Sequence, residues 1–207
     1  MQLYKVKKLD VDFFLRTDTL SIAQALLGKL IISRFDGREA IGRIVETEAY
    51  LGITDRASHA YGGRRTARTR VMYLPGGHAY VYLCYGIHHL FNIVTNRQDI
   101  PHAILLRALE PVAGLDIMMQ RRQKQKADHS LTRGPGSLSQ AMGFHTGLSG
   151  MSLGGHSLFI ADDGFHLQPQ QMGTSPRIGV DYAGEDALLP YRFFVRGNAW
   201  VSGQKNG

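Results

Sequence analysis

The chain has 207 residues, 43% of them hydrophobic, which is typical of one globular domain with its own core. Lysine and arginine number 24 against 17 acids, and the formal charge of +7 favours an anionic partner such as nucleic acid or acidic lipid. The single cysteine, Cys84, excludes an internal disulfide, and no apolar run approaches the ~20 residues of a membrane span. We see no signal peptide, so a cytoplasmic monomer is expected.

The first predicted elements are a helix and a hairpin. A helix is predicted over residues 18–27, because a capping aspartate or threonine begins its apolar pattern and a glycine follows it. A strand over residues 30–33 comes next, and Asp36-Gly37 is typical of a hairpin turn. The return strand is expected from about residue 40, and it leads into a stretch that holds two acids.

Glu46 and Glu48 stand at the end of this apolar strand. Extended backbone places Glu46, Glu48 and Tyr50 on one face and the residues between them on the other. Carboxylates at the end of a buried strand cost free energy unless they are paired or take part in chemistry. The pattern fits a functional site, and from spacing alone it fits an edge strand with solvated acids equally well.

A basic run follows between Gly62 and Arg70. It holds four arginines in seven residues, with threonine hydroxyls between them. Arginine forks match phosphate oxygens in geometry and charge. A solvated basic loop would show the same composition, but the neighbouring acidic and aromatic stretch favours contact with a phosphate.

A second hairpin is predicted around Tyr85. Alternation along the preceding strand places Tyr80, Tyr82 and Cys84 on one face. Gly86 puts Tyr85 at or near the hairpin tip, where a tyrosine has little to pack against; a core tyrosine with a bonded hydroxyl is the alternative. Cys84 lies in an apolar and aromatic run and is expected to be an inert core thiol.

The remaining elements are read from apolar runs and from proline and glycine. Arg107 is the only charge within its apolar strand, so a carboxylate partner is expected. Pro111 is expected to open a helix, because proline suits the first turn. Residues 144–175 are interpreted as loops and short strands. Further strands are predicted at 90–94, 102–109 and 191–196, and helices at 111–123 and 136–142.

These elements predict an α+β fold. We expect a single compact domain over residues 1–207, in which a curved, mostly antiparallel β-sheet carries the site and helices surround it. The sequence shows no Gly-rich phosphate signature before a helix, no nucleophile elbow and no Cys-x-x-Cys. We therefore expect no metal site and no cofactor.

The ordered motifs resemble those of the alkyladenine (3-methyladenine) DNA glycosylase family, in the form found in many bacteria. The resemblance runs from about residue 10 to residue 202. It implies a monofunctional enzyme that flips damaged purines, alkylated or deaminated, out of duplex DNA and hydrolyses the N-glycosidic bond. The matching segments are 43–52, 57–59, 62–64, 80–86, 92–93, 105–111 and 195–197.

The resemblance also implies roles for single residues. Glu48 would activate the attacking water, and Arg107 would help to hold that water together with a backbone carbonyl near Val195. Tyr85 would enter the duplex where the base has left. The base pocket would be formed by Tyr50, His59, Tyr82 and Asn92, and the DNA backbone would be contacted by Arg64, Thr66 and Arg68.

Further expectations concern selectivity and partners. The electron-rich faces of Tyr50 and Tyr82 would favour alkylated purines that carry a positive charge. No lysine is placed for a Schiff base, so an intact abasic site would remain. The expected partner is double-stranded DNA containing damaged purines. Alternatives are a non-catalytic module that binds damaged DNA, an N-ribosyl hydrolase of free nucleosides, and a protein that acts on RNA or tRNA.

Overall fold

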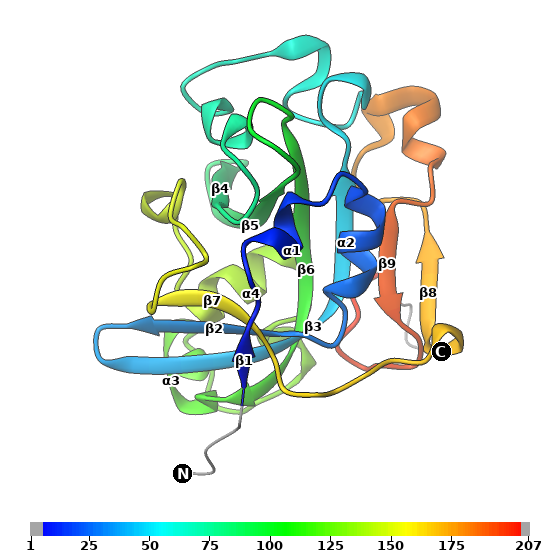
Figure 1. Ribbon diagram of the computed structural model, residues 1–207. Coiled ribbons are helices and arrows are strands. Elements are labelled where there is room, and N and C mark those ends of the chain that lie inside the picture. Colours follow the sequence, from blue (N-terminus) through cyan, green and yellow to red (C-terminus); the bar gives the residue numbers. More distant parts are fainter. Residues whose placement is uncertain (1–5, 204–207) are drawn as a thin grey trace.

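One antiparallel β-sheet forms the centre of the molecule (Figure 1). The computed structural model describes residues 6–203. The strands follow the order β1-β7-β2-β3-β6-β5-β4, and β9 pairs with both β3 and β8. The α+β prediction with a mostly antiparallel sheet is confirmed. The strands are β1 (Lys7–Lys8), β2 (Leu30–Phe35), β3 (Arg38–Tyr50), β4 (Ala79–Cys84), β5 (His88–Thr95), β6 (His102–Ala113), β7 (Leu158–Asp162), β8 (Met172–Ser175) and β9 (Arg192–Val195).

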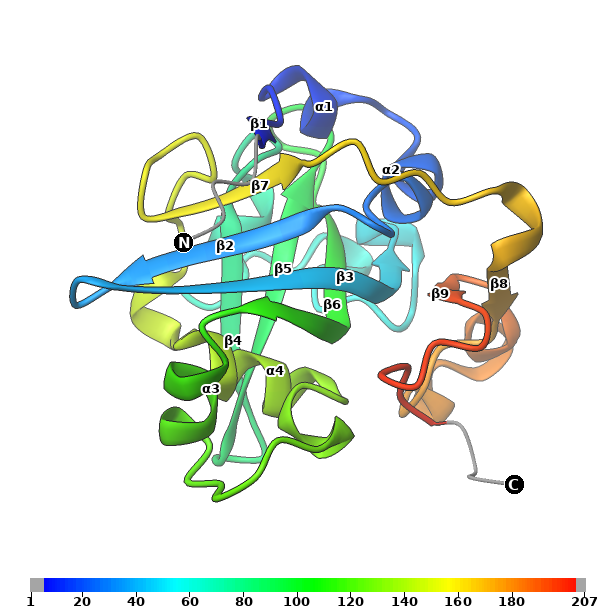
Figure 2. The same cartoon turned by 90° about the horizontal axis from the view of Figure 1, so that it is seen from below.

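Four short α-helices and several 3₁₀ segments cover the sheet. In the view of Figure 2, α1 and α2 lie on one side of the β2–β3 hairpin and α3 and α4 on the other. The helices are α1 (Asp12–Leu15), α2 (Thr19–Ala25), α3 (Leu115–Arg121) and α4 (Pro135–Met142). The 3₁₀ segments are Gly52–Thr54, Tyr61–Gly63, Arg70–Tyr73, His129–Leu131, Thr146–Leu148, Pro169–Gln171 and Asp181–Leu188.

The β2–β3 hairpin forms as its turn sequence predicts. Asp36 and Gly37 have φ values of 55° and 70°, the left-handed pair that a two-residue hairpin turn requires. Register then runs without interruption from Phe35 opposite Arg38 to Leu30 opposite Arg43. The turn thus fixes which residues of β3 face the core.

The sheet branches at β3. One edge of this strand pairs with β2 over Arg38–Arg43 and with β9 over Glu46–Glu48, while the other edge pairs with β6. The acidic end of β3 is therefore enclosed by strands on both sides. Both carboxylates are fully buried, which rules out the alternative of an edge strand with solvated acids.

The register between β3 and β6 is irregular, and this irregularity turns the side chain of Arg107 toward these acids. Ile44 lies opposite Leu109 and Glu46 opposite Ala108, whereas Thr47 already faces Leu106. Arg107 is thus left without a partner in the ladder. Bulges of this kind bend a strand and redirect a side chain, and here the redirected guanidinium meets Glu46 and Glu48.

The opposite face of β3 packs on α2. Ile22, Ala23 and Leu26 are fully buried there, and the Thr47 hydroxyl donates to the Ala23 carbonyl over 3.0 Å. The helix begins where predicted, because the Asp18 side chain accepts from the Ser21 amide. One face of β3 therefore serves the core and the other holds the acids.

The predicted helix at 111–123 begins too early. Pro111 lies in β6 opposite Gly42, and α3 starts at Leu115. Proline fits this strand because the register shifts between Ile41 and Gly42, and because β5 pairs only with the first part of β6. The fifth strand also starts earlier than predicted, at His88.

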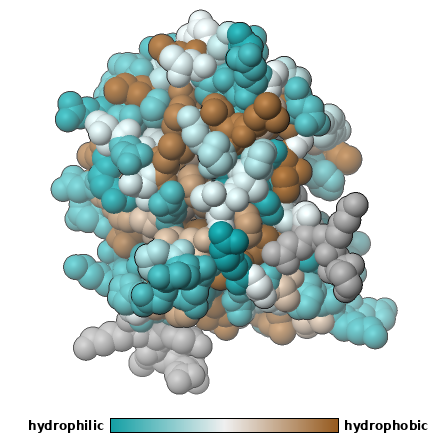
Figure 3. Space-filling view, turned by 90° about the vertical axis from the view of Figure 1, so that its right-hand side faces the viewer, coloured by the Kyte–Doolittle hydropathy of each residue, from teal (hydrophilic) through white to brown (hydrophobic). Residues whose placement is uncertain are grey.

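The surface is mixed in character. Figure 3 shows apolar side chains interrupting the polar surface over the upper half of the face that lies on the right of Figure 1. The large exposed apolar side chains of the molecule include Tyr182 and Leu188 in the 3₁₀ segment Asp181–Leu188, and Tyr85 and Ile87 at the β4–β5 turn. Within residues 6–203 there is no helix with the length and apolar character needed to cross a bilayer.

Candidate active site

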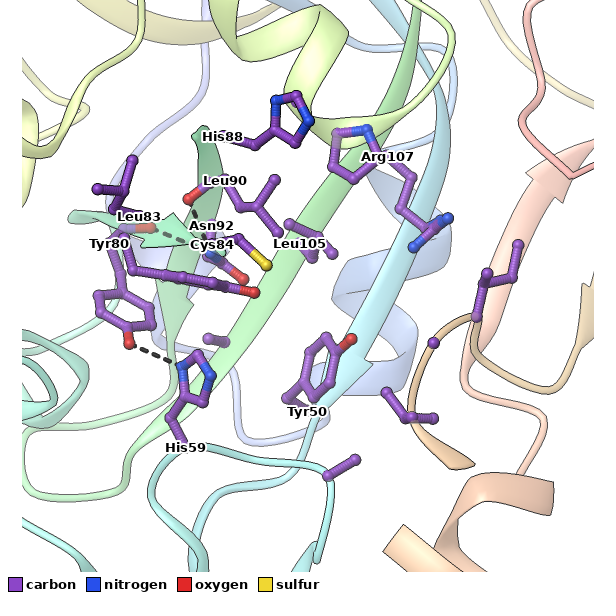
Figure 4. Close-up of a pocket in the computed structure, with 18 of the residues that line it drawn as sticks. Tyr50, His59, Tyr80, Leu83, Cys84, His88, Leu90, Asn92, Leu105 and Arg107 are labelled. Atoms are coloured by element: carbon purple, nitrogen blue, oxygen red, sulfur yellow. Dashed lines mark hydrogen bonds between the residues drawn. The ribbon is translucent and has the colours of Figure 1, made fainter. Parts of the chain in front are cut away.

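A cavity of about 590 Å³ opens between the β4–β6 end of the sheet and the loops that face it. Its walls come from those strands, the start of α4, the loop that carries His59 and Arg68, and residues 178–182. Figure 4 shows Tyr50 and Arg107 on one side of the cavity and His59, Tyr80 and Asn92 on the other. All four predicted pocket residues line it, namely Tyr50, His59, Tyr82 and Asn92.

Glu48 lies directly behind the cavity wall. Its Oε1 accepts from the Ile178 amide over 2.8 Å and lies 3.2 Å from Nη1 of Arg107. Its Oε2 accepts from the Tyr50 hydroxyl over 2.8 Å. Tyr50, Arg107 and Ile178 all line the cavity. A carboxylate has about four acceptor positions, so one position on Oε2 is left for a further donor.

Arg107 is shared between two acids. Its Nε donates to Oε1 of Glu46 over 3.0 Å, and its Nη1 reaches Glu48. Glu46 also accepts from Nε of Arg192 over 2.7 Å and from the amide and hydroxyl of Ser202. Burial lowers the pKa of Arg107, but Glu48 and Glu46 more than offset this and raise the pKa overall. The guanidinium therefore stays charged.

Tyr50 lines the cavity, and its hydroxyl donates a hydrogen bond to Glu48. Burial, and secondly the charge of Glu48, raise the pKa of Tyr50 well above its usual value, so the hydroxyl keeps its proton. The guanidinium of Arg177 lies 4.9 Å from the ring centroid, and it is itself paired with Asp55. The Arg177 guanidinium thus helps to hold the Tyr50 ring in place.

His59 is held neutral. Its Nδ1 lies 2.8 Å from the Tyr80 hydroxyl, and its Nε2 lies 3.3 Å from Nη2 of Arg68. Burial, then the charges of Arg68 and Arg64, lower the pKa of His59 to about 4. Because Arg68 can only donate, Nε2 is the acceptor and Nδ1 carries the hydrogen. Tyr80 was not among the predicted site residues, although strand alternation puts it on the face of Tyr82.

Asn92 and Tyr82 close the inner end of the cavity. The Asn92 amide nitrogen donates to the carbonyls of Tyr80 and Leu90 over 3.1 and 3.3 Å, which fixes the side chain and leaves its oxygen free of these bonds. The ring of Tyr82 lies 4.6 Å from that of His59 at a steep angle of 78°. Burial raises the pKa of Tyr82, so its hydroxyl is also protonated.

Tyr85 projects at the rim of the cavity. It is 92% exposed, at the turn between β4 and β5, as its position before Gly86 predicts. Its φ of 49° lies in the left-handed region, which is costly for a side chain with a Cβ. The free protein thus holds this tyrosine in a strained and solvated position.

The basic run forms an exposed loop beside the cavity. Arg64 and Thr66 are exposed, and the loop is braced from within by Thr69, whose hydroxyl donates to the Arg64 carbonyl over 3.0 Å. Arg65 turns away, toward Asp99 and the ring of Tyr73. Arg68 differs from its neighbours, because it lines the cavity with its guanidinium 4.7 Å from the centroid of Tyr82.

One expectation about this site is wrong, because Cys84 is half-buried and lines the cavity rather than the core. The backbone amide of Ile178 meets Glu48 directly. Val195 lies beyond Phe194, which pairs with Glu46, and the role expected for a carbonyl near Val195 in holding water stays a prediction.

Two wall segments had no predicted role. Residues 178–182 follow the buried Arg177, whose guanidinium ties the segment to Asp55 and to the carbonyl of Ala49. Gly134 to Ser137 form the start of α4, and a Cβ on Gly136 would meet the His88 ring at 3.0 Å. The Gly-Pro-Gly sequence was a signal for close approach here; the segment at 178 carries no comparable pattern.

At the cavity wall, one buried carboxylate, Glu48, meets one buried guanidinium, Arg107. In the described part of the chain, no group of three or more His, Cys, Asp or Glu side chains is arranged to hold a metal ion. The chemistry available at the cavity wall is that of Glu48 and Arg107, which combine a buried carboxylate with a fixed positive charge.

Comparison with known proteins matches the sequence of this chain to a family. The family model described as methylpurine-DNA glycosylase (MPG) matches residues 12–199. A protein of Natranaerobius thermophilus, named "Putative 3-methyladenine DNA glycosylase", is 44% identical over 196 residues, covering 94% of this chain and 98% of its own. Proteins with the same name from Chlamydia pneumoniae and Desulfitobacterium hafniense are 45% and 40% identical, and cover 90% and 95% of this chain and 94% and 99% of their own. The chain therefore belongs to the methylpurine-DNA glycosylase family, whose enzymes hydrolyse N-glycosyl bonds in DNA.

Proposed function

We propose that this protein is a monofunctional DNA glycosylase that flips damaged purines out of duplex DNA and hydrolyses their N-glycosidic bond with a water activated by Glu48. The observation that carries the proposal is the position of Glu48. It is a fully buried carboxylate directly behind a cavity large enough for a nucleobase. Its two hydrogen-bond donors, Tyr50 and Ile178, and its ion-pair partner Arg107 all come from that cavity's wall.

The hydrogen bonds of Glu48 suit the activation of water. Ile178 donates to Oε1, Tyr50 donates to Oε2 and Arg107 lies beside Oε1, so the carboxylate keeps an acceptor position on Oε2 that a water proton would occupy. Glu48 would accept that proton as the water attacks C1′, while its charge stabilises the oxocarbenium-like sugar. Arg107 holds the carboxylate in place through the ion pair.

The rim of the cavity suits base flipping. Turning a base out of the stack costs a few kcal/mol. Tyr85 is exposed beside the cavity and could fill the gap that the base leaves, where an aromatic stack is worth ~1–3 kcal/mol. The strained φ of Tyr85 supports this role, since nothing in the free protein rewards the position.

The surroundings suit a duplex rather than a free nucleoside. Arg64 and Thr66 stand beside the cavity in an exposed loop, and the chain carries a formal charge of +7. Contacts of this kind to the phosphates dominate the affinity of DNA-binding proteins and fix their register. No lysine is among the described residues that line the cavity, so the reaction would stop at an intact abasic site.

Duplexes carrying one 3-methyladenine or one hypoxanthine test the proposal. We expect release of the free base, with strand breakage only after alkali has cleaved the abasic site. Absence of release from both duplexes, with binding retained, would favour a module that only recognises damage. Faster release from the free nucleoside would favour an N-ribosyl hydrolase, and faster release from an RNA duplex would favour a protein that acts on RNA. Strand breakage without alkali would contradict the monofunctional reaction.

A further inference from the structure

A buried ion pair between Asp55 and Arg177 joins two segments of the cavity wall. Nη1 and Nη2 of Arg177 lie 2.5 and 2.9 Å from Oδ2 and Oδ1 of Asp55, and the side chains of Arg177 and Asp55 are 0% and 2% exposed. Arg177 directly precedes Ile178, and Asp55 accepts from the amide of Ala57; both of these neighbours line the cavity. The pair itself does not line it, so it can act on a bound base only through the residues that it holds.

The pair holds Tyr50 on both sides along the chain. Nη1 of Arg177 donates to the carbonyl of Ala49 over 3.0 Å, and Oδ2 of Asp55 accepts from the amide of Leu51 over 3.0 Å. The Arg177 guanidinium also lies 4.9 Å from the centroid of the Tyr50 ring. The same two side chains therefore fix the backbone before and after Tyr50 and contact its ring.

The pair also determines the position of Ile178. The amide of this residue, next to Arg177 in the chain, donates to Oε1 of Glu48 over 2.8 Å. Nη2 of Arg177 donates to the carbonyl of Asp186 over 3.0 Å, which anchors the far end of the same segment. The other hydrogen bond to Glu48 comes from the Tyr50 hydroxyl. Both hydrogen-bond donors of Glu48 are thus positioned by one guanidinium.

The hydrogen bonds of the pair set it apart from simple packing. The oxygens of Asp55 accept from two nitrogens of Arg177 and from the amides of Leu51 and Ala57, which fills the roughly four acceptor positions of a carboxylate. Nε of Arg177, by contrast, is buried without a hydrogen-bond partner within residues 6–203. A buried unpaired donor costs free energy, so packing alone does not explain an arginine at this position.

We propose that Arg177, held by Asp55, is a positioning residue that sets the rate of base release by fixing both hydrogen-bond donors of Glu48. This inference rests on the proposed glycosylase function, in which Glu48 activates water. The Tyr50 hydroxyl and the Ile178 amide determine where the carboxylate oxygens lie, and thus where the remaining acceptor position on Oε2 is directed. A misplacement of about 1 Å in such geometry can lower a rate by on the order of a hundredfold.

Arg177→Lys tests this inference, because lysine keeps the positive charge and loses the planar fork that bonds Asp55 and Ala49 together. Single-turnover release of hypoxanthine from a duplex is measured over a range of protein concentrations. We expect the maximal rate to fall by at least about tenfold, while the protein concentration that gives half of this rate stays within about twofold of the parent's. A parent-like maximal rate would overturn the inference, and so would a change in the half-maximal concentration alone.

Arg43 provides a matched control on β3. It forms a two-pronged pair with Asp163 at 3.1 and 2.8 Å, the two side chains are 16% and 11% exposed, and its guanidinium lies 4.3 Å from the centroid of Phe165. None of these three residues lines the cavity. Arg43→Lys should lower the free energy of unfolding, as Arg177→Lys does, and keep the parent's maximal rate of release. An equal loss of rate in both variants would overturn the inference, because the rate would then follow stability.

Asp55→Asn serves where Arg177→Lys does not fold. It keeps the size of the side chain and weakens the hold on Arg177, so it should also lower the maximal rate. In a Glu48→Gln background, either variant should leave the residual rate unchanged, because the pair acts through Glu48. A further loss of the same size in that background would overturn the inference. Failure of the parent protein to release the base would instead overturn the proposed function.

Discussion

Tyr85 holds a strained and exposed position at the rim of the cavity. It is 92% exposed, and its backbone adopts a left-handed φ of 49°. Such strain persists where the surrounding structure enforces it, and it often marks a functional position. The side chain therefore contributes little to folding and is available for a duplex.

Replacing Tyr85 by serine should separate folding from function. We expect the free energy of unfolding to change by no more than about 0.5 kcal/mol, as for most exposed sites. Base release from a duplex without other distortion should fall by at least about fivefold, because the loss of one stack is worth ~1–3 kcal/mol. Urea unfolding and single-turnover release measure the two effects. Leu188→Ser removes another exposed apolar side chain, which lies outside the cavity, and should change neither. A parent-like rate in Tyr85→Ser would contradict the wedge role.

Single residues were predictable where strand periodicity applied. Alternation alone placed Tyr82 with Tyr80, and Glu48 with Glu46 and Tyr50, and the carboxylate partner expected for Arg107 is present. The resemblance to the family added His59 and Asn92, which no pattern of spacing would have selected. Ile178 was missed because an irregular loop has no period from which the direction of a backbone amide could be read.

At the scale of elements, the site depends on the junction of β3, β6 and β9. Glu46 joins these strands, because its carboxylate bonds Arg107 on β6 and Arg192 on β9. Removing one partner of a buried charge network leaves the others uncompensated, which costs far more than the loss of an exposed pair. Glu46 thus positions Arg107 for Glu48 and stabilises the branch in the sheet.

Glu46→Gln should test that junction. We expect a loss of about 3–5 kcal/mol in the free energy of unfolding, since two buried guanidinium groups lose their shared charge. Urea denaturation of the purified variant measures it. The control, Glu39→Gln, breaks a pair with Arg34 in which both side chains are about half exposed, and about 0–1 kcal/mol is expected. Equal decreases in the free energy of unfolding for Glu46→Gln and Glu39→Gln would show that the buried network contributes no more to stability than the exposed pair.

The elements show where prediction from sequence ended. The hairpin at Asp36-Gly37 and the N-cap of α2 depend on local chemistry and formed as predicted, whereas α2 ends at Ala25, before the predicted residue 27. Pro111 was assigned to a helix because the sequence alone does not show its strand surroundings. In the fold it lies at a register shift, beside a part of β6 that β5 does not pair with, and both features arise only from tertiary structure. The unpaired position of Arg107 likewise depends on how β3 and β6 align, and these strands lie about 60 residues apart in the chain. The sequence of either strand alone does not predict it.

At the scale of the whole molecule, two half-buried histidines, His59 and His102, should make stability depend on pH. Burial is the first cause that lowers the pKa of both His59, to about 4, and His102. The unfolded chain binds a proton on each histidine below about pH 6.5, and the folded protein does not. Stability therefore falls as pH decreases from about 6.5 toward 4.

Urea unfolding at pH 8, 6.5 and 5 measures this dependence. We expect little change between pH 8 and 6.5 and a decrease between pH 6.5 and 5. His59→Asn should show a shallower decrease, because one of the two neutral histidines is gone. Constant or rising stability of the parent between pH 6.5 and 5 would contradict the neutral state of His59 in the folded protein.

The whole account depends on the meeting of distant segments at one cavity, and above all on Glu48. The most direct test is single-turnover release of hypoxanthine by Glu48→Gln, with duplex binding measured in parallel. Glutamine keeps the size of the side chain and cannot accept the proton of water, so we expect a loss of at least about a hundredfold in rate with binding retained. Release at the parent rate, with the variant folded and bound to the duplex, would contradict the assignment of Glu48 as the group that activates water.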